Sequence, residues 1–156
     1  MNKLEEYIPG DLVMTNGVPL GTEKDVIYRV TSSDPSKILK LNDETVLKGV
    51  VCLENMEGAE IGDKGYLSGD SCAWVKDIVP ITLTSGILEK NGWIRKKDIP
   101  FAYTKGVYTI IECVNKPGVF CVCFGISEYH TLRYVMYVHQ LQHLYFSLGS
   151  DSNMIV

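Results

Sequence analysis

The chain has 156 residues, of which 46% are hydrophobic and 22% are charged, and its formal net charge at pH 7 is −4. This apolar content excludes a disordered chain, and the length suits one domain or two small lobes with a real core. Because proteins that neutralise nucleic-acid phosphates usually carry a basic excess, the acidic balance argues against nucleic acid as the partner.

The first half of the chain predicts short strands separated by turns. A strand is expected at residues 12–15, and Asn16-Gly17 after it is typical of a tight turn. Further strands are predicted at residues 25–31, 37–41, 45–53 and 71–79, with a turn at 32–35 and a glycine-rich loop at 54–70. Short strands with such turns favour a small β-barrel or a curled sheet.

Pro80 marks the predicted boundary between two lobes, because the hydrophobic period changes after it. Thr84 as N-cap and Asn91-Gly92 as stop predict a helix over residues 85–91. Extended segments are expected at residues 100–103, 107–114, 119–126 and 129–136, with a turn at 115–118. The chain is therefore predicted to hold a β-rich lobe, residues 1–79, and an α+β lobe, residues 80–156.

The C-terminal segment 137–149 switches to helical spacing. Five apolar residues recur at steps of three and four and so share one face: Val138, Leu141, Leu144, Tyr145 and Leu148. The polar side chains His139, Gln140, His143 and Ser147 are expected elsewhere on the helix. Gly149 ends the helix, and the tail 150–156 is expected to fray, with residues 154–156 as the part that could dock.

The N-terminus lacks the apolar core of a secretory signal, and the longest apolar run, residues 119–126, is too short to cross a bilayer as a helix. We therefore expect a cytoplasmic protein without a membrane span. The five cysteines include no CxxC pair. In a reducing compartment they are expected to act as small buried hydrophobic residues.

His139 and His143 lie four residues apart, which puts both on one helix face, as in helical zinc sites. The segment between them is Gln-Leu-Gln, so the glutamate of the HExxH motif is missing and no local general base is supplied. The alternative, which we favour, is that these side chains bond loop backbone at the edge of the core. Whether the pair binds a metal ion stays open.

Three cysteines of the second half, Cys113, Cys121 and Cys123, could share a metal only from one face of a sheet. If the turn at 115–118 is a two-residue loop, centred on either 116–117 or 117–118, the numbers of two directly opposed residues add up to an odd value. Cys113 then lies on the sheet face opposite to that of Cys121 and Cys123. Glu112 then shares the face of Cys121 and Cys123, either as an acid–base group or as part of a solvated face, which we favour. A loop longer by one residue would reverse this geometry.

Aromatic and cationic side chains gather in the last predicted strand, at Tyr129, His130, Arg133 and Tyr134. Such groups suit an anionic aromatic ligand such as a nucleotide, with the tyrosines stacking and Arg133 pairing with phosphate. Alternation along a strand would divide them between two faces, so a half-buried edge strand explains the same pattern. The sequence holds neither a glycine-rich phosphate loop nor a GxSxG elbow, and we expect no cofactor.

Residues 137–148, YVHQLQHLYFSL, resemble the "YVHQLQNLYFAL" ending of a family of short proteins from Bacteroidales genomes, their phages and mobile elements. Residues 79–84 and 88–93 are similar to that family's "IPLTEEWLLKFGF" segment, and residues 10–13 to its "GNLV" or "GDWV" strand. This chain departs from the family at His143, usually asparagine, and at Ser85 and Gly86, usually acids. The resemblance implies a curled β-module of the Src-homology-3 type followed by a helix, strands and helix.

The resemblance implies no particular activity, since fold alone does not specify one. We therefore expect a non-catalytic phage or mobile-element protein that blocks a host protein or sequesters a nucleotide immune signal, with Tyr129, His130, Arg133 and Tyr134 as ligand-binding residues. The alternative is a small metal-dependent hydrolase or nuclease that uses His130, His139, His143 and Glu112. A homo-oligomer stays open, and neither a membrane nor nucleic acid is an expected partner.

Overall fold

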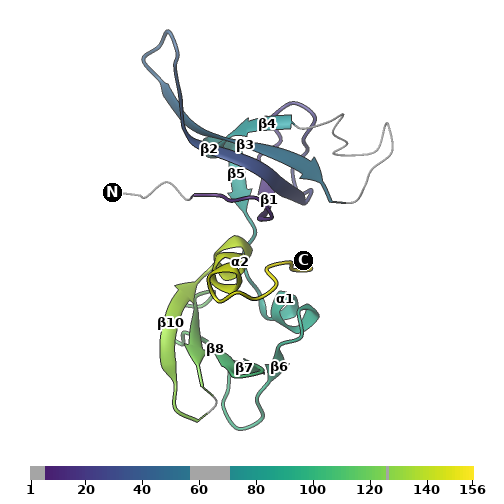
Figure 1. The fold of residues 1–156 in the computed structure, drawn as a ribbon, viewed down its shortest axis with the longest axis vertical. Helices are drawn as coiled ribbons and strands as arrows, with labels where there is room; N and C mark the ends of the chain where they lie inside the picture. Colours follow the sequence, from purple (N-terminus) through teal and green to yellow (C-terminus); the bar gives the residue numbers. More distant parts are fainter. Residues whose placement is uncertain (1–5, 57–70, 126) are drawn as a thin grey trace. The chain divides into compact units, whose positions relative to one another are not determined.

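The computed structural model describes residues 6–56, 71–125 and 127–156. The chain divides into two compact units, unit 1 (Met1–Ile81) and unit 2 (Thr82–Val156). Each unit is built on a five-stranded antiparallel sheet, and helices are few, so the fold is α+β (Figure 1). Of the loop predicted at residues 54–70, residues 57–70 lie outside the described residues.

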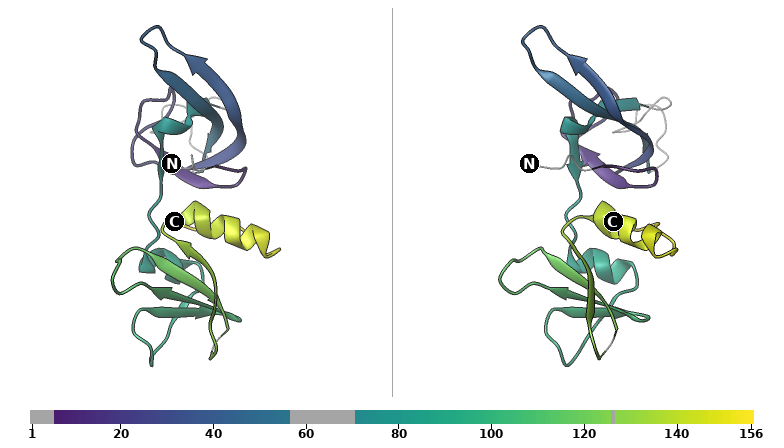
Figure 2. Two further views of the ribbon diagram at one scale, coloured as in Figure 1. Left: turned by 90° about the vertical axis from the view of Figure 1, so that its left-hand side faces the viewer. Right: turned by 60° about the vertical axis from the view of Figure 1, so that its left-hand side comes forward.

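Unit 1 contains the strands β1 (Leu12–Thr15), β2 (Tyr28–Lys40), β3 (Val46–Asn55), β4 (Ser71–Trp74) and β5 (Ile78–Pro80). A single 3₁₀ turn, η1 (Val75–Asp77), separates β4 from β5, so the strand predicted at residues 71–79 is interrupted. The sheet order is β4-β3-β2-β1-β5. The β2–β3 hairpin extends beyond the other strands of this unit (Figure 2).

Strand β2 runs through residues 32–35, where the sequence predicts a turn, so that prediction is wrong. Its pairing with β3 shifts between Val30 and Ser32 and again between Asp34 and Ile38. Pro35 lies in the second irregularity, where its missing N–H breaks no ladder hydrogen bond. The turn residues therefore mark a bulge in a long hairpin arm.

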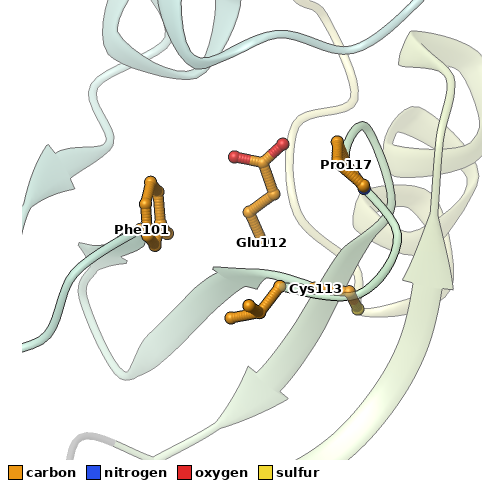
Figure 3. Close-up of a pocket in the computed structure, with 5 residues that line it drawn as sticks. Phe101, Glu112, Cys113 and Pro117 are labelled. Carbon is orange, nitrogen blue, oxygen red and sulfur yellow. The ribbon is translucent and has the colours of Figure 1, made fainter.

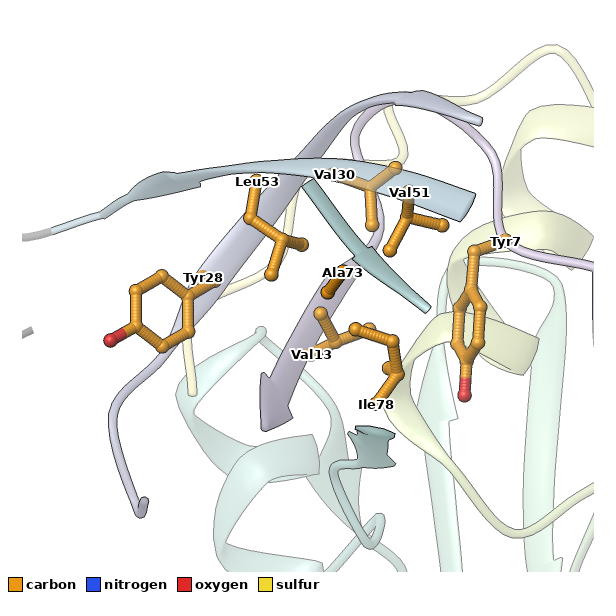
Figure 4. Close-up of a cluster of buried hydrophobic side chains, with 8 residues drawn as sticks. All are labelled: Tyr7, Val13, Tyr28, Val30, Val51, Leu53, Ala73 and Ile78. Atoms are coloured by element: carbon orange, nitrogen blue, oxygen red, sulfur yellow. The ribbon is translucent and has the colours of Figure 1, made fainter. Parts of the chain in front are cut away.

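The core of unit 1 lies on one face of this sheet (Figure 4). Alternate residues of β3, Val51 and Leu53, are buried there, as the period of two in a strand requires. The core cluster consists of Tyr7, Val13, Tyr28, Val30, Val51, Leu53, Ala73 and Ile78. The Tyr28 hydroxyl accepts a hydrogen bond from the Glu23 amide at 2.9 Å, which satisfies its polar end.

A buried carboxylate ties the loop after β1 to η1. Asp77 accepts hydrogen bonds from the Asn16 side chain at 2.9 Å and from the Lys76 ammonium at 2.8 Å. Burial alone would raise the pKa of Asp77, but the bonds from Lys76 and Asn16 and the Lys76 charge outweigh it, so the pKa lies below its usual value. The loop is therefore held by an ionised group at neutral pH.

Unit 2 contains α1 (Ser85–Lys90), β6 (Ile94–Arg95), β7 (Ala102–Lys105), β8 (Tyr108–Glu112), β9 (Phe120–Phe124), β10 (His130–Val135) and α2 (Val138–Ser147). The sheet order β10-β9-β8-β7-β6 follows the chain, which makes it a simple meander. The predicted helix at residues 85–91 is confirmed, because the Thr84 hydroxyl accepts the Ile87 amide at 3.2 Å as an N-cap.

Helix α2 buries two polar residues, His139 and Gln142, of which the sequence assigns His139 elsewhere on the helix. Its buried residues are Val138, His139, Leu141, Gln142 and Leu144. The start of the helix is fixed by Gln140, whose side-chain oxygen accepts the Met136 and Tyr137 amides at 2.8 and 3.2 Å. The expected placement of His139 away from the buried face is therefore wrong.

The C-terminal tail does not fray; residues 154 and 155, in the part that could dock, contact unit 2 instead. Met154 is buried, and the Asn91 side chain exchanges two hydrogen bonds with the Ile155 backbone, at 2.7 and 2.9 Å. Gln142 donates to the Ser152 carbonyl at 3.1 Å. The tail is thus held to unit 2 by hydrogen bonds from Asn91 and Gln142. In the described parts of the chain, no helix is both long and apolar enough to span a membrane.

Candidate functional site

The turn between β8 and β9 is longer than the two-residue loop assumed from the sequence. Glu112 lies opposite Phe120, and the Cys113 amide donates to the Val119 carbonyl at 2.8 Å, which leaves residues 114–118 as the loop. Opposing residue numbers therefore sum to an even value. The predicted register, and with it the placement of Cys113 on the Phe120 face, is wrong.

The corrected register places the thiols of β9 on the same sheet face as residues 111 and 109 of β8, because directly opposed residues share a face. Ile111 lies opposite Cys121, and Thr109 lies opposite Cys123. The Cys121 and Cys123 sulfurs are 3.6 Å apart. Glu112 lies on the other face, so it is not the cross-strand neighbour of a thiol.

A bulge in β10 brings Tyr134 to the thiol face. The pairing with β9 shifts between Thr131 and Arg133, so that Thr131 lies opposite Cys123 and Tyr134 lies opposite Cys121. The bulge reverses the alternation expected for an unbroken strand. Tyr134 therefore shares its face with Cys121, whereas Arg133, opposite Val122, lies on the other face.

Burial controls the chemistry of this thiol group. Desolvation first, then the hydrogen bond and charge of Cys121, raises the pKa of Cys123 to about 11. The charges of the nearby thiols, Cys121 foremost, also raise the pKa of the Tyr134 phenol. Since the thiolate is the metal ligand and the nucleophile, a protonated Cys123 is poorly suited to either role at neutral pH.

One pocket of unit 2 lies between the β8–β9 turn and the start of α2. It has a volume of about 510 Å³, within the range typical of small-ligand sites. Its walls are Cys113, Lys116, Val119, Tyr134, Met136 and Gln140. Gln140 is held in place by the two backbone amides that it caps, so this wall is fixed by the helix terminus.

A smaller pocket of about 310 Å³ lies on the other side of the same turn (Figure 3). Its lining includes Phe101, Glu112 and Pro117, and it shares Cys113 with the larger pocket. Figure 3 shows the Glu112 carboxylate between Phe101 and Pro117. The Glu112 carboxylate accepts a hydrogen bond from the Gly118 amide at 2.9 Å. This acid therefore stabilises the turn, and nothing in the contact gives it the role of a reacting group.

Exposed apolar side chains border both pockets. Phe101, Val114, Tyr134 and Met136 are each 40–80% exposed. Phe101 also has a left-handed backbone, with φ of 61°, which a bulky residue adopts only at a cost. We call the turn residues 113–119 together with these bordering side chains the turn surface. Exposed apolar side chains that border a pocket are a feature of binding sites.

Of the four residues that the sequence assigns to ligand binding, Tyr134 lines the larger of these two pockets, and the other three line neither. The Tyr129 hydroxyl accepts a hydrogen bond from Lys96 at 3.0 Å, and the Lys96 ammonium lies 5.7 Å from the Tyr129 ring centre. His130 lies opposite Phe124, on the same face as Arg133. The structure therefore divides the predicted set among three surroundings.

The two histidines of α2 do lie together. Their rings are 5.6 Å apart and nearly perpendicular, and the Tyr137 ring stacks on His139 at 5.9 Å. Desolvation, then the charges of His143 and Arg133, lowers the pKa of His139 to about 4. Across residues 6–56, 71–125 and 127–156, no three histidine, cysteine or acidic side chains are grouped so that they could hold a metal ion.

No protein-family model, curated protein or solved structure matches this chain. The site must therefore be interpreted from its own geometry. Lys116, Val119, Met136 and Gln140 are the pocket residues that sequence reasoning did not assign to a ligand or a metal. No local signal in the sequence points to them, because the length of the 114–118 loop sets which side chains face Tyr134 and turn residues alone do not fix that length.

Proposed function

We propose that the protein is a non-catalytic binding protein whose unit 2 takes a small anionic ligand with an aromatic ring, of the nucleotide class. The supporting observation is the pocket of about 510 Å³ that combines Lys116 and Tyr134 with apolar walls. Mostly apolar pockets with a few placed polar groups are the usual form of a small-molecule site. The pocket offers a cation and an aromatic face, which are the two features that such a ligand needs.

Within this proposal, Tyr134 stacks on the ligand ring and Lys116 pairs with its anionic group. An aromatic side chain stacked on a base contributes about 1–3 kcal/mol. Among the described residues, no carboxylate is paired with Lys116. Its ammonium can therefore meet a phosphate without first giving up an ion pair, although its exposure makes the attraction sensitive to salt.

Isothermal titration calorimetry with cyclic and linear nucleotides tests the proposal. We expect at least one nucleotide to bind, Tyr134→Ala to weaken its affinity at least tenfold, and Lys116→Ala to weaken it and reduce its salt dependence. The matched control is Tyr129→Ala, which removes a tyrosine that lies outside the pocket. The absence of both binding heat and a thermal shift with every nucleotide in the panel would exclude this function, and so would an equal loss of affinity with Tyr129→Ala.

A second candidate is a partner protein that the turn surface blocks, and the exposed Phe101, Val114 and Met136 favour it. Apolar anchors seated in pockets dominate the energy of many protein interfaces. A photo-crosslinking amino acid at position 114, introduced in host cells, should then give one discrete cross-linked species. The control position is Ile94, which is also exposed but lies in the edge strand β6.

The biological setting that we propose is counter-defence by a phage or mobile element in the bacterial cytoplasm, and it rests on the sequence resemblance. We also propose that unit 1 is a module of the Src-homology-3 type. Its strand order and the 3₁₀ turn before the last strand are the supporting observations. An experimental structure in which the sheet curls to close on itself would support this assignment, and a flat open sheet would oppose it.

The competing enzyme hypothesis makes a separate prediction. A metal-dependent hydrolase or nuclease would carry stoichiometric metal and would lose rate on His139→Ala while the fold stays intact. Because His139 is buried and Glu112 braces the turn, we expect elemental analysis to find no such metal. A melting curve that shifts on chelation would favour the enzyme instead.

A further inference from the structure

Two cysteines of unit 1 lie directly opposite each other on neighbouring strands. Cys52 of β3 pairs with Cys72 of β4 in antiparallel register. Their sulfur atoms are 2.8 Å apart, closer than the 3.6 Å between the sulfurs of Cys121 and Cys123. A disulfide bond is about 2.0 Å long, so a sub-ångström movement separates the two thiols from bonding distance.

The backbone already has the spacing that a disulfide requires. Directly opposed residues of an antiparallel pair have Cα atoms about 4.5 or 5.5 Å apart, depending on their hydrogen bonding. Both values fall within the window of about 4.4–6.8 Å found for disulfides. Bonding would therefore need side-chain rotation and no rearrangement of β3 or β4.

The pair is also accessible from solvent. The neighbours Val51 and Ala73 are buried, so the alternation of the strands directs the cysteines to the outer face. Cys72 is exposed and Cys52 is half-buried. A small oxidant can thus react with Cys72 first, and the Cys52 sulfur lies close enough to attack the Cys72 sulfur afterwards.

We propose that Cys52 and Cys72 are a thiol modification site that a low-molecular-weight disulfide, such as oxidised glutathione, converts to an intramolecular disulfide. The Cys72 thiolate attacks one sulfur of the small disulfide, forming a mixed disulfide and releasing one glutathione thiolate. The Cys52 thiolate then attacks the Cys72 sulfur and releases the second. The protein loses two electrons and two protons, and the small disulfide is reduced to two thiols.

The bond would covalently join β3 to β4 at residues 20 positions apart in the chain. Closing a loop of this length constrains the unfolded chain, so the oxidised protein should be the more stable form. The same linkage requires that the folded state favours formation of the bond. The disulfide is therefore expected to form far more readily in the folded protein than in the unfolded chain.

Mass spectrometry of the full chain in glutathione buffers of rising oxidised fraction tests this site. Trypsin separates the two cysteines, because Lys48, Lys64 and Lys76 place them in peptides 49–64 and 65–76. The other three cysteines fall together in peptide 106–133. We expect the first two peptides to become linked, while the cysteines of the third still react fully with an alkylating agent once the protein is denatured. The oxidised protein should melt higher by on the order of 10 °C.

Two variants control the measurement. Cys72→Ser should abolish both the linked peptides and the rise in melting temperature, whereas Cys113→Ser should keep both. In the same glutathione buffer with added denaturant, the equilibrium constant for forming the disulfide should be at least tenfold lower than in the folded protein. Glutathione retained on Cys72 without linkage to Cys52 would overturn the proposal, as would equal linkage in folded and denatured protein.

Discussion

Units 1 and 2 both use a five-stranded antiparallel sheet, but they complete their cores differently. The core of unit 1 is made almost wholly of strand residues, with Tyr7 added from the segment before β1. Unit 2 adds buried residues from both helices and from the tail, namely Leu88, Leu141 and Met154. A meander of short strands therefore depends on elements from both ends of its unit, and its stability should respond to changes far from the sheet.

The two units also treat their cysteines differently. In unit 1, opposed residues on an outer face bring two sulfurs to 2.8 Å. In unit 2, Cys123 is buried within a sheet, and the pKa of its thiol is raised to about 11. Position in the strand pairing, rather than the number of cysteines, thus decides which thiols can react.

The largest expected effect is the loss of a core side chain from one unit. Leu141→Ala should lower the stability of unit 2 by about 4 kcal/mol, because a buried leucine leaves a cavity when truncated. Each unit holds one tryptophan, Trp74 in unit 1 and Trp93 in unit 2, so fluorescence of variants retaining only one of them reports on one unit. We expect the Trp93 signal to shift to lower denaturant. A Trp74 signal that shifts equally would show that this core is shared.

The pH dependence should separate the units next. The pKa of His139 is about 4 in the folded protein and 6.5 in an unfolded chain, so between these values only the unfolded chain binds the proton. Its contribution to stability is complete above pH 6.5 and is lost as the pH falls to 4, for a total of about 3 kcal/mol. Comparing the denaturation of unit 2 at pH 7 and at pH 5 should show about half of this loss. His139→Gln should flatten the dependence more than His143→Gln, and equal slopes would contradict the assignment.

The tail provides a third test, because only unit 2 uses one. Met154→Ala should destabilise this unit by about 2 kcal/mol, since its side chain is buried. Ile155→Ala is the matched control, because that side chain is exposed and its bonds to Asn91 come from the backbone. Chemical denaturation followed at Trp93 measures both variants. Equal effects would show that the tail acts through its backbone alone.

The smallest expected effect comes from loss of a hydrogen bond between a residue that follows α1 and helix α2. The Trp93 indole, after α1, donates to the Tyr145 hydroxyl of α2 at 2.7 Å. Tyr145→Phe should cost about 1 kcal/mol, because it leaves the indole donor without this partner. Urea denaturation gives the value, and Tyr108→Phe, outside this contact, serves as the control. An unchanged midpoint would mean that water replaces the bond.

Local signals in the sequence predicted most elements but not how they combine. Thr84 and Asn91 define α1 because caps act within a few residues, and strand β1 has its predicted bounds. The β8–β9 register escaped prediction because it depends on a loop length that Pro117 and Gly118 do not determine. His139 was misplaced since the buried face of α2 is set by what packs against it, which spacing along one helix does not contain.

The candidate site was harder still to predict. Tyr134 was identified from its chemistry, but its pocket partners depend on the register and on the bulge between Thr131 and Arg133. Neither feature has a local signature. The Cys52–Cys72 pair likewise depends on pairing across residues 20 positions apart in the chain. The sequence thus indicates which side chains have suitable chemistry, whereas only the tertiary structure shows which of them lie together.

The central claim is that the pocket beside the turn surface binds an anionic aromatic ligand. Titrating the ¹⁵N-labelled full chain with the nucleotide panel, followed by amide chemical shifts, tests it most directly. We predict saturable shifts centred on Lys116, Val119, Tyr134, Met136 and Gln140, with unit 1 unaffected. The claim would be contradicted if no amide shifts with any nucleotide, or if the shifts gather around Tyr129 and Lys96 instead.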